Sequence, residues 1–287
     1  MNIRTFAFVF AAALPALADS TVSPAARFSY GGNIGWLNGR HDQPFAPSGL
    51  VVSEYTITGR AYGANIGWIG FGVTPAGGVR FSQFAGDTGV NHDGTGNLSG
   101  WAYGANVGWI SFNWAAPVSP NRPQVDLSTG AFSGYAYGAN IGWINLATLT
   151  TQSIAAPDTD GDQMADAWER EHFGNLTTAA LGTDADGDGA SDVAEYTAMT
   201  APNNSSDFFK IVSQFYDVTM TTVVLQFTTT QHRRYRLQWS PDLATWVNDA
   251  THGIFAPDPG ATTTRAVTFP SGAKRFFRAI AIKPLQN

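Results

Sequence analysis

The nonapeptide AYGANIGWI occupies residues 61–69 and returns at 136–144, with AYGANVGWI at 102–110 and the diverged SYGGNIGWL at 29–37. Intervals of 32, 41 and 34 residues separate the four asparagines, Asn33, Asn65, Asn106 and Asn140. Intervals of this length are typical of one supersecondary unit per copy. We expect about three strands per unit, with the asparagine in a left-handed turn, and a first unit that lacks its opening strand.

Successive side chains of a strand point to opposite faces, which explains why each unit combines small residues with aromatic ones. Gly59 and Ala61 should share one face of their strand, where their small size lets another layer approach closely. We expect the repeated tryptophans to stack between units and fill the core rather than to bind sugar rings. They are Trp36, Trp68, Trp109 and Trp143. Trp114 is the better candidate for an exposed contact. The pattern leaves a solenoid, a prism-like barrel and a propeller open.

Two acidic loops follow the repeats, DTDGDQMADAWE at 158–169 and DADGDGASDVAE at 184–195. Carboxylates stand at positions one, three, five, nine and twelve of each loop, and a backbone carbonyl at position seven completes the oxygen set that Ca²⁺ needs. Five carboxylates in twelve residues repel one another unless a cation lies among them. We therefore favour a calcium site over the alternative of solvated acidic turns. The predicted ligands are Asp158, Asp160, Asp162, Met164, Asp166 and Glu169 in the first loop, and Asp184, Asp186, Asp188, Ala190, Asp192 and Glu195 in the second.

The two loops differ at the sixth position, where the chain must turn sharply. Gly189 stands there in the second loop and Gln163 in the first. One helix is expected after each loop, from Asp166 to about Phe173 and from Ser191 to about Met199. The 14 residues between the loops are too few for a helix on both sides of each loop.

The loop-then-helix arrangement of residues 158–203 resembles the thrombospondin type 3 and dockerin-like calcium repeats of secreted bacterial proteins. The resemblance implies EF-hand-like calcium binding and an extracellular setting, but no reaction. The nonapeptide is similar to GWAYGxNxGWI repeats of secreted bacterial proteins, and this likeness implies no activity.

The whole chain is expected to be mainly β. Residues 1–18 read as a cleaved signal peptide, because an apolar run precedes Ala16-Leu17-Ala18. A β-repeat domain (19–150) and a linker (151–157) precede the paired calcium loops and short helices (158–203). The alternating pattern of 207–287 predicts a small β-sandwich of fibronectin type III character.

Composition narrows the function. The net charge is −6 and no basic stripe is present, which disfavours nucleic acid as a partner. No segment is long and apolar enough to span a membrane. The chain has no cysteine, and its five histidines form no zinc motif; a serine elbow and a phosphate loop are also absent, so we do not expect an enzyme.

Two function classes stay open. The first is a secreted calcium-binding structural or interaction protein, in which a calcium-stiffened linker joins two β domains and the partner is an extracellular protein or polysaccharide. The second is a carbohydrate-binding module that uses exposed Trp and Tyr side chains of the repeats.

Overall fold

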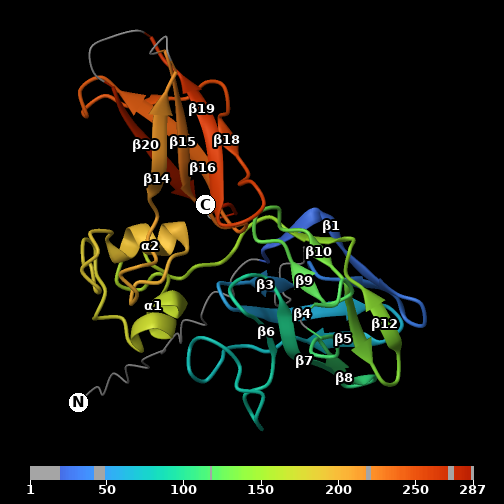
Figure 1. Ribbon diagram of the computed structural model, residues 1–287. Helices are drawn as coiled ribbons and strands as arrows, with labels where there is room; N and C mark the ends of the chain where they lie inside the picture. Colours follow the sequence, from blue (N-terminus) through green and yellow to red (C-terminus); the bar gives the residue numbers. More distant parts are fainter. Residues whose placement is uncertain (1–19, 42–48, 117, 218–220, 271–274, 286–287) are drawn as a thin grey trace, which may run out of the picture.

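A computed structural model describes residues 20–41, 49–116, 118–217, 221–270 and 275–285, and the expected signal peptide lies outside them. Two β domains flank a segment with two short helices (Figure 1). The N-terminal β domain lies at the lower right of Figure 1, the C-terminal one at the top, and the helices beside both. The chain is mainly β, as expected.

The four copies of the nonapeptide form four antiparallel hairpins that close into an eight-stranded barrel. Neighbouring hairpins pair along the whole series, and β12 returns to β1 through Tyr30↔Asn145 and Gly31↔Ile144. The structure therefore selects the barrel over the solenoid and the propeller. The hairpins are β1 (Val22–Gly31) with β2 (Gly35–Asn38), β4 (Thr56–Gly63) with β5 (Gly67–Gly70), β7 (Leu98–Gly104) with β8 (Gly108–Ser111), and β11 (Tyr135–Gly138) with β12 (Gly142–Asn145).

The asparagine side chains tie the hairpin turns to one another. Each Nδ2 donates to the carbonyl oxygen of the residue that follows the asparagine of a neighbouring hairpin, at 3.1 Å in all four cases. The four bonds form a closed ring: Asn65 to Ile34, Asn106 to Ile66, Asn140 to Val107 and Asn33 to Ile141. The amides thus bridge the turns at one end of the barrel.

The expectation of left-handed asparagines is wrong. The left-handed residue is the glycine two positions later, with φ between 75° and 80° in Gly35, Gly67, Gly108 and Gly142. Because glycine adopts this conformation without a steric cost, the asparagine can use its side chain for the neighbouring hairpin.

Shorter strands extend the barrel at its other end. They are β3 (Leu50–Val52), β6 (Val90–His92), β9 (Gln124–Val125), β10 (Phe132–Ser133) and β13 (Leu149–Thr151). β3 pairs with β4, and β6 pairs with both β4 and β7. The second and third units therefore have the three strands expected, and the first described unit begins directly with its hairpin strand.

The long strands change partners at a glycine. Gly59, Gly100 and Gly134 have φ of 89°, 85° and 75°, and a Cβ at any of them would collide with a backbone oxygen of a neighbouring segment. The expected close approach on the small face is confirmed at these three positions. Only glycine satisfies both the positive φ and the missing space.

The barrel interior is filled by aliphatic side chains, and the tryptophans lie outside. Ala61, Ile69, Ala102 and Ile110 are buried in the core, which keeps a cavity of only about 20 Å³. The interior of an eight-stranded barrel is just wide enough for side chains to fill it, and the rings of Phe112 and Phe132 join the aliphatic side chains of this core. Trp36, Trp68, Trp109 and Trp143 are 56, 39, 51 and 48 % exposed. The expectation that they fill the core is wrong.

Each of these tryptophans packs against the tyrosine opposite it in its own hairpin, with ring centroids 4.6–5.1 Å apart in the pairs Tyr30–Trp36, Tyr62–Trp68, Tyr103–Trp109 and Tyr137–Trp143. Trp68 and Trp143 also contact a ring of a neighbouring unit, His41 at 4.7 Å and Trp114 at 4.4 Å. Trp114 is half-buried: its ring packs on Trp143 at 4.4 Å, and its Nε1 donates to the Tyr135 carbonyl at 2.6 Å.

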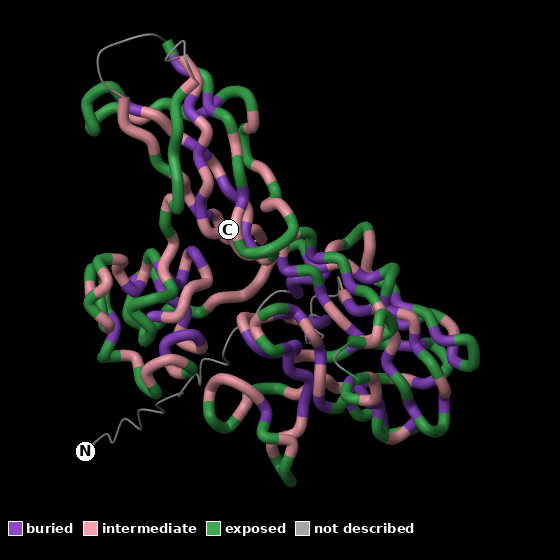
Figure 2. The backbone as a smooth tube through the Cα atoms, viewed as in Figure 1, coloured by how far each residue is buried: buried purple, intermediate pink, exposed green. Residues whose placement is uncertain are grey.

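The C-terminal domain consists of two antiparallel sheets with one apolar core. One sheet has the order β14-β15-β19, and in the other β16 pairs with β17, β18 and β20. Figure 2 shows buried residues alternating with partly exposed ones along β15 and β16, whereas β14 is exposed over nearly its whole length. The strands are β14 (Ile211–Tyr216), β15 (Thr222–Thr228), β16 (Arg234–Ser240), β17 (Val247–Asn248), β18 (Ile254–Phe255), β19 (Thr262–Thr268) and β20 (Phe276–Ile282).

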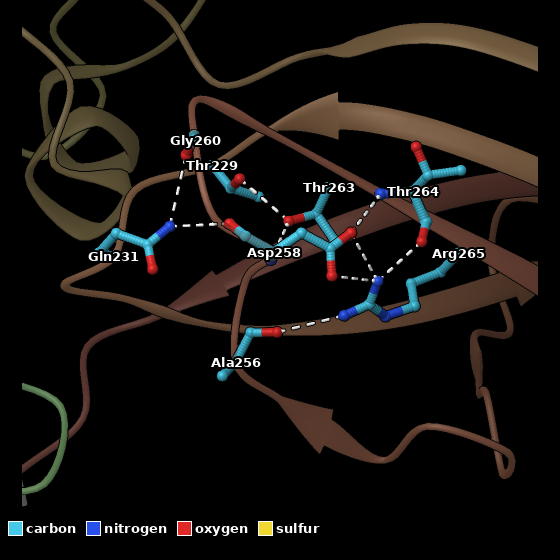
Figure 3. A network of polar contacts seen from close by, with 8 residues as sticks. All are labelled: Thr229, Gln231, Ala256, Asp258, Gly260, Thr263, Thr264 and Arg265. Atoms are coloured by element: carbon cyan, nitrogen blue, oxygen red, sulfur yellow. Dashed lines mark hydrogen bonds and ion pairs between the residues drawn. The ribbon is translucent and has the colours of Figure 1, made fainter.

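A polar network fixes the turn between β18 and β19. Asp258 accepts two hydrogen bonds from Arg265 Nη1, at 2.8 and 2.9 Å, and its own N–H donates to Thr263 Oγ1 at 2.8 Å (Figure 3). These contacts stay within the domain, so the turn has a structural role.

Replacing Gly100 by alanine should lower the free energy of unfolding of the barrel by about 2 kcal/mol or more, because the left-handed conformation alone costs an L residue roughly 1–2 kcal/mol and the Cβ would meet the Gly89 carbonyl. Gly77→Ala is the matched control, since nothing lies within 4 Å of its Cβ. Urea unfolding followed by tryptophan fluorescence measures both variants. Equal stability of the two would contradict this account of the bend.

Candidate metal centre

The two acidic loops lead into helices whose bounds agree with those expected. α1 spans Asp166–Phe173 and ends at Gly174 with φ of 76°, and α2 spans Asp192–Ala198. The Ser191 side chain caps α2 by accepting from the Ala194 N–H, and Met199 ends it with φ of 64°. Each helix therefore begins three residues before the glutamate of its loop, and so carries that glutamate on its first turn.

Both loops fold in the same way around their first aspartate. Asp158 accepts from the N–H groups of Gly161 and Gln163, at 2.7 and 3.0 Å. Asp184 accepts from Gly187 and Gly189 at the equivalent positions, at 2.8 and 2.9 Å. The third aspartates, Asp162 and Asp188, likewise accept from the N–H of Met164 and Ala190. The predicted carbonyl ligands thus occupy equivalent places.

The sixth position is left-handed in both loops, although only one of them has glycine there. Gly189 has φ of 96° and Gln163 has φ of 75°. The first loop therefore reaches the same conformation with a residue that is strained in it. The sequence difference between the loops costs free energy without changing the shape.

Three of the five carboxylates predicted for each loop lie close together. In each loop, one oxygen from each of three aspartates lies within 4.8 Å of the others, in the sets Asp158, Asp160, Asp162 and Asp184, Asp186, Asp188. The twelfth-position glutamates are almost completely buried, with Glu169 0 % and Glu195 1 % exposed. No donor in the described chain reaches either carboxylate oxygen of Glu169, nor the buried oxygens Glu195 Oε2, Asp162 Oδ2, Asp186 Oδ2 and Asp188 Oδ2.

The aspartates at the ninth position of each loop, Asp166 and Asp192, accept hydrogen bonds from a threonine hydroxyl and from a backbone N–H. Asp166 accepts from both the N–H and the hydroxyl of Thr159, at 2.7 Å each. Asp192, which is fully buried, accepts from the Thr183 hydroxyl and from the Ala185 N–H at 3.1 Å. These two carboxylates close their loops through direct hydrogen bonds. In EF-hands the ninth position often reaches the metal through water.

Electrostatics single out the two buried glutamates. Burial raises the pKa of the Glu169 carboxyl to about 7, and the charges of Asp162 and Asp160 add to this effect. Burial also raises the pKa of Glu195 to about 7, although a hydrogen bond from Thr200 acts in the opposite direction. A carboxylate whose pKa is raised by neighbouring acids and by burial is strongly stabilised by a cation.

The segment that contains α1 and α2 packs against the barrel. Trp168 of α1 and Tyr196 of α2 stack at 5.2 Å, and both belong to an apolar cluster with Tyr55 from the β3–β4 connection. Arg80 lies over the Tyr55 ring at 4.3 Å and pairs with Glu171 of α1 at 2.6 Å. The aromatic residues next to each loop glutamate therefore anchor the helices.

All three parts of the chain meet at Glu54. Its carboxylate accepts from the Tyr196 hydroxyl at 2.8 Å and from Lys283 Nζ, just after β20, at 2.7 Å. Arg233 of the C-terminal domain donates to the Thr197 and Tyr196 carbonyls at 2.7 and 3.2 Å. Burial lowers the pKa of Lys283 to about 7, against the attraction of Glu54. Sequence reasoning missed this junction, because Glu54 and Lys283 are 229 residues apart and neither lies in a motif.

Replacing Gln163 by glycine should tighten metal binding at the first loop about two- to fivefold. Holding an L residue in the left-handed conformation costs roughly 1–2 kcal/mol, and glycine removes this cost. Glycine also loses more conformational entropy when the loop is ordered, which offsets roughly 0.5–1 kcal/mol of the gain. Gln163→Ala, which keeps the strain, is the control and should bind like the wild type. Calorimetric titration with calcium measures both. A glycine variant that binds no more tightly than the alanine variant would contradict the idea that this position is strained.

No helix in the described ranges is long and apolar enough to cross a membrane. Comparison with protein-family models, with curated proteins and with solved structures found no match.

Proposed function

We propose that the chain is an exported calcium-binding scaffold protein, in which two calcium loops hold two β domains in a fixed arrangement. One observation carries the proposal: the glutamate at position twelve of each loop is buried against an aspartate cluster with carboxylate oxygens that no protein donor satisfies. Leaving such a charged group buried and unpaired costs several kcal/mol or forces it to bind a proton. A cation at each cluster removes that cost.

The donor set favours calcium over other metals. The clusters offer oxygen atoms only, whereas zinc in proteins is usually held by sulfur and nitrogen. Calcium accepts 6–8 oxygens in flexible geometry, while magnesium demands a near-ideal octahedron. In the first site Asp158, Asp160, Asp162, the Met164 carbonyl and Glu169 would hold the ion, and Asp166 would act through water. The second site would use Asp184, Asp186, Asp188, the Ala190 carbonyl, Glu195 and Asp192 in the same way.

Metal binding would act on the domains through the helices. Glu169 follows Trp168 and Glu195 precedes Tyr196, so each proposed ligand is adjacent to a residue of the apolar cluster. Fixing the glutamates fixes the first turn of α1 and α2, and with it the Tyr196 bond to Glu54. Helices of 8 and 7 residues are too short to persist alone, so they depend on this packing and on the ion.

Several expectations from the sequence complete the proposal. The likeness to thrombospondin type 3 and dockerin-like repeats, together with the signal-peptide pattern, supports a secreted protein. For residues 207–287, seven antiparallel strands divided three and four between two sheets support fibronectin type III character. An extracellular protein or polysaccharide is the proposed partner class, and no catalytic role is proposed.

Calorimetric titration of the metal-free protein should give two calcium ions per chain. At free calcium 100 times the dissociation constant, each site should stabilise the folded state by about 2.7 kcal/mol. Glu195→Gln should remove the second site and keep the first. The matched control is Glu171→Gln, because Glu171 lies on α1 but faces Arg80. Two intact sites in Glu195→Gln, or loss of a site in Glu171→Gln, would contradict the ligand assignment.

The metal-free protein should lose stability as the pH rises from 5 to 8. Because the pKa of Glu169 and Glu195 is raised to about 7, the folded state binds more protons than the unfolded state between about pH 4.5 and 7. The free energy of unfolding therefore falls with pH through this window. Saturating calcium, which keeps both carboxylates ionised, should abolish the fall.

Thermal unfolding at both pH values tests this dependence. Histidines also titrate in the window, so the informative quantity is the difference between the wild type and a Glu169→Gln/Glu195→Gln double variant. The same pH dependence in both proteins would refute the role of the two glutamates.

A further inference from the structure

The third hairpin is the only one of the four described hairpins that presents two exposed tryptophans. Trp101 and Tyr103 on β7 and Trp109 on β8 are 39, 48 and 51 % exposed. The positions equivalent to Trp101 hold Phe28, Arg60 and Tyr135 in the other units. Trp101 is therefore a property of this unit and not a requirement of the barrel, whose core it does not enter, whereas the position of Trp109 holds tryptophan in all four units.

The rings of this hairpin are held in place before any ligand arrives. Trp109 stacks on Tyr103 at 4.9 Å and meets the edge of Trp101 at 6.5 Å. Tyr103 lies directly opposite Trp109 in the ladder, and Trp101 lies opposite Ser111. Rings fixed on paired strands lose little conformational entropy on binding.

Three surface grooves meet at Trp101 and Trp109. The first, of about 300 Å³, is lined by these two rings with Gln83 and Thr88. The second, of about 610 Å³, lies between this hairpin and the rings of Trp114 and Tyr137. The third, of about 480 Å³, runs toward Trp68 and Arg60. These volumes fall in the range of small-molecule and cofactor sites.

The chemistry of the grooves is aromatic and polar but almost without charge. None of the described residues that line the first two grooves carries a charge, in a chain whose net charge is −6. Gln83 is fixed by donating from Nε2 to the Gly89 carbonyl at 2.9 Å and to the Phe81 carbonyl at 3.3 Å. The first groove therefore has a fixed amide side chain beside the two indole rings.

We propose that the surface around Trp101 and Trp109 binds a neutral glycan built from pyranose rings with equatorial hydroxyls. Such rings present flat C–H faces, which the negative face of an indole attracts, and a rim of hydroxyls, which amides and hydroxyls of the groove can bind. An anionic polymer would need basic side chains, and Arg60 is the one cation among the described residues that line the three grooves. β7 and β8 lie on the side of the barrel away from the C-terminal domain, so that domain leaves this hairpin accessible to a long polymer (Figure 1).

Native gels that contain one soluble polysaccharide each provide the test on the full chain with calcium held constant. The neutral probes are hydroxyethyl cellulose, mixed-linkage β-glucan, arabinoxylan and glycol chitin, and polygalacturonate is the anionic comparison. At least one neutral probe should retard the wild type. Trp101→Ala and Trp109→Ala should each weaken that retardation at least tenfold, and Trp101→Tyr, which keeps a ring, should retain most of it.

Trp36→Ala is the matched control, because Trp36 pairs with Tyr30 in the same way, is 56 % exposed and lines none of the three grooves. Its retardation should stay within twofold of the wild type, and thermal unfolding should show all variants folded. Lack of retardation by every neutral probe would overturn the proposal, as would equal losses in Trp36→Ala and Trp109→Ala. A dimer in sedimentation that Trp109→Ala dissociates would instead assign the surface to a second copy of the chain.

Discussion

The hydrogen bond from an asparagine amide to the next hairpin is the contact on which the N-terminal domain depends. It occurs four times at 3.1 Å, and it joins hairpins that could otherwise slide past one another. The strand ladders hold each hairpin together and pair neighbours, while the amides fix the turns relative to one another. This arrangement requires glycine two residues later, because only the glycine lets the chain turn back while the asparagine points sideways.

The two acidic loops instead bring like charges together, and no donor in the described chain reaches several of their buried carboxylate oxygens. Hydrogen bonds from backbone N–H groups satisfy part of each cluster, and Thr159 and Thr183 occupy the ninth-position acids. No donor in the described chain reaches either carboxylate oxygen of Glu169 or the Oε2 of Glu195, and burial raises the pKa of both carboxyls to about 7. Trp168 and Tyr196 are the direct sequence neighbours of the two glutamates, and they belong to the apolar cluster that joins the helices to the barrel. The unfavourable burial of the two carboxyl groups therefore lies where the three parts of the chain meet.

Local features were predictable from the sequence and distant ones were not. The loop spacing and the helix bounds depend on residues within twelve positions of one another, and the structure reproduces the clustering of the aspartates and the ends of α1. Placing the tryptophans required knowing which face of each hairpin is inside, and that is decided by closure between β1 and β12. The asparagine ring joins Asn33 to a carbonyl 108 residues away, and no local pattern encodes that partner. Glu54 and Lys283 meet for reasons of packing between domains, which sequence periodicity does not describe.

Closure also limits how such a domain can change over time. An open stack of units can gain or lose a copy at its end, and each copy keeps the same neighbours. Here β12 must return to β1, so a fifth hairpin would widen the barrel and leave an interior that alanine and isoleucine no longer fill. Once the barrel is closed, duplication of a hairpin is therefore incompatible with its packed interior. What can vary more freely is the outward residue of each unit: the series Phe28, Arg60, Trp101 and Tyr135 spans apolar, charged and aromatic side chains, while the inward positions change only from alanine to Ser29 and from isoleucine to Leu37 in the first unit.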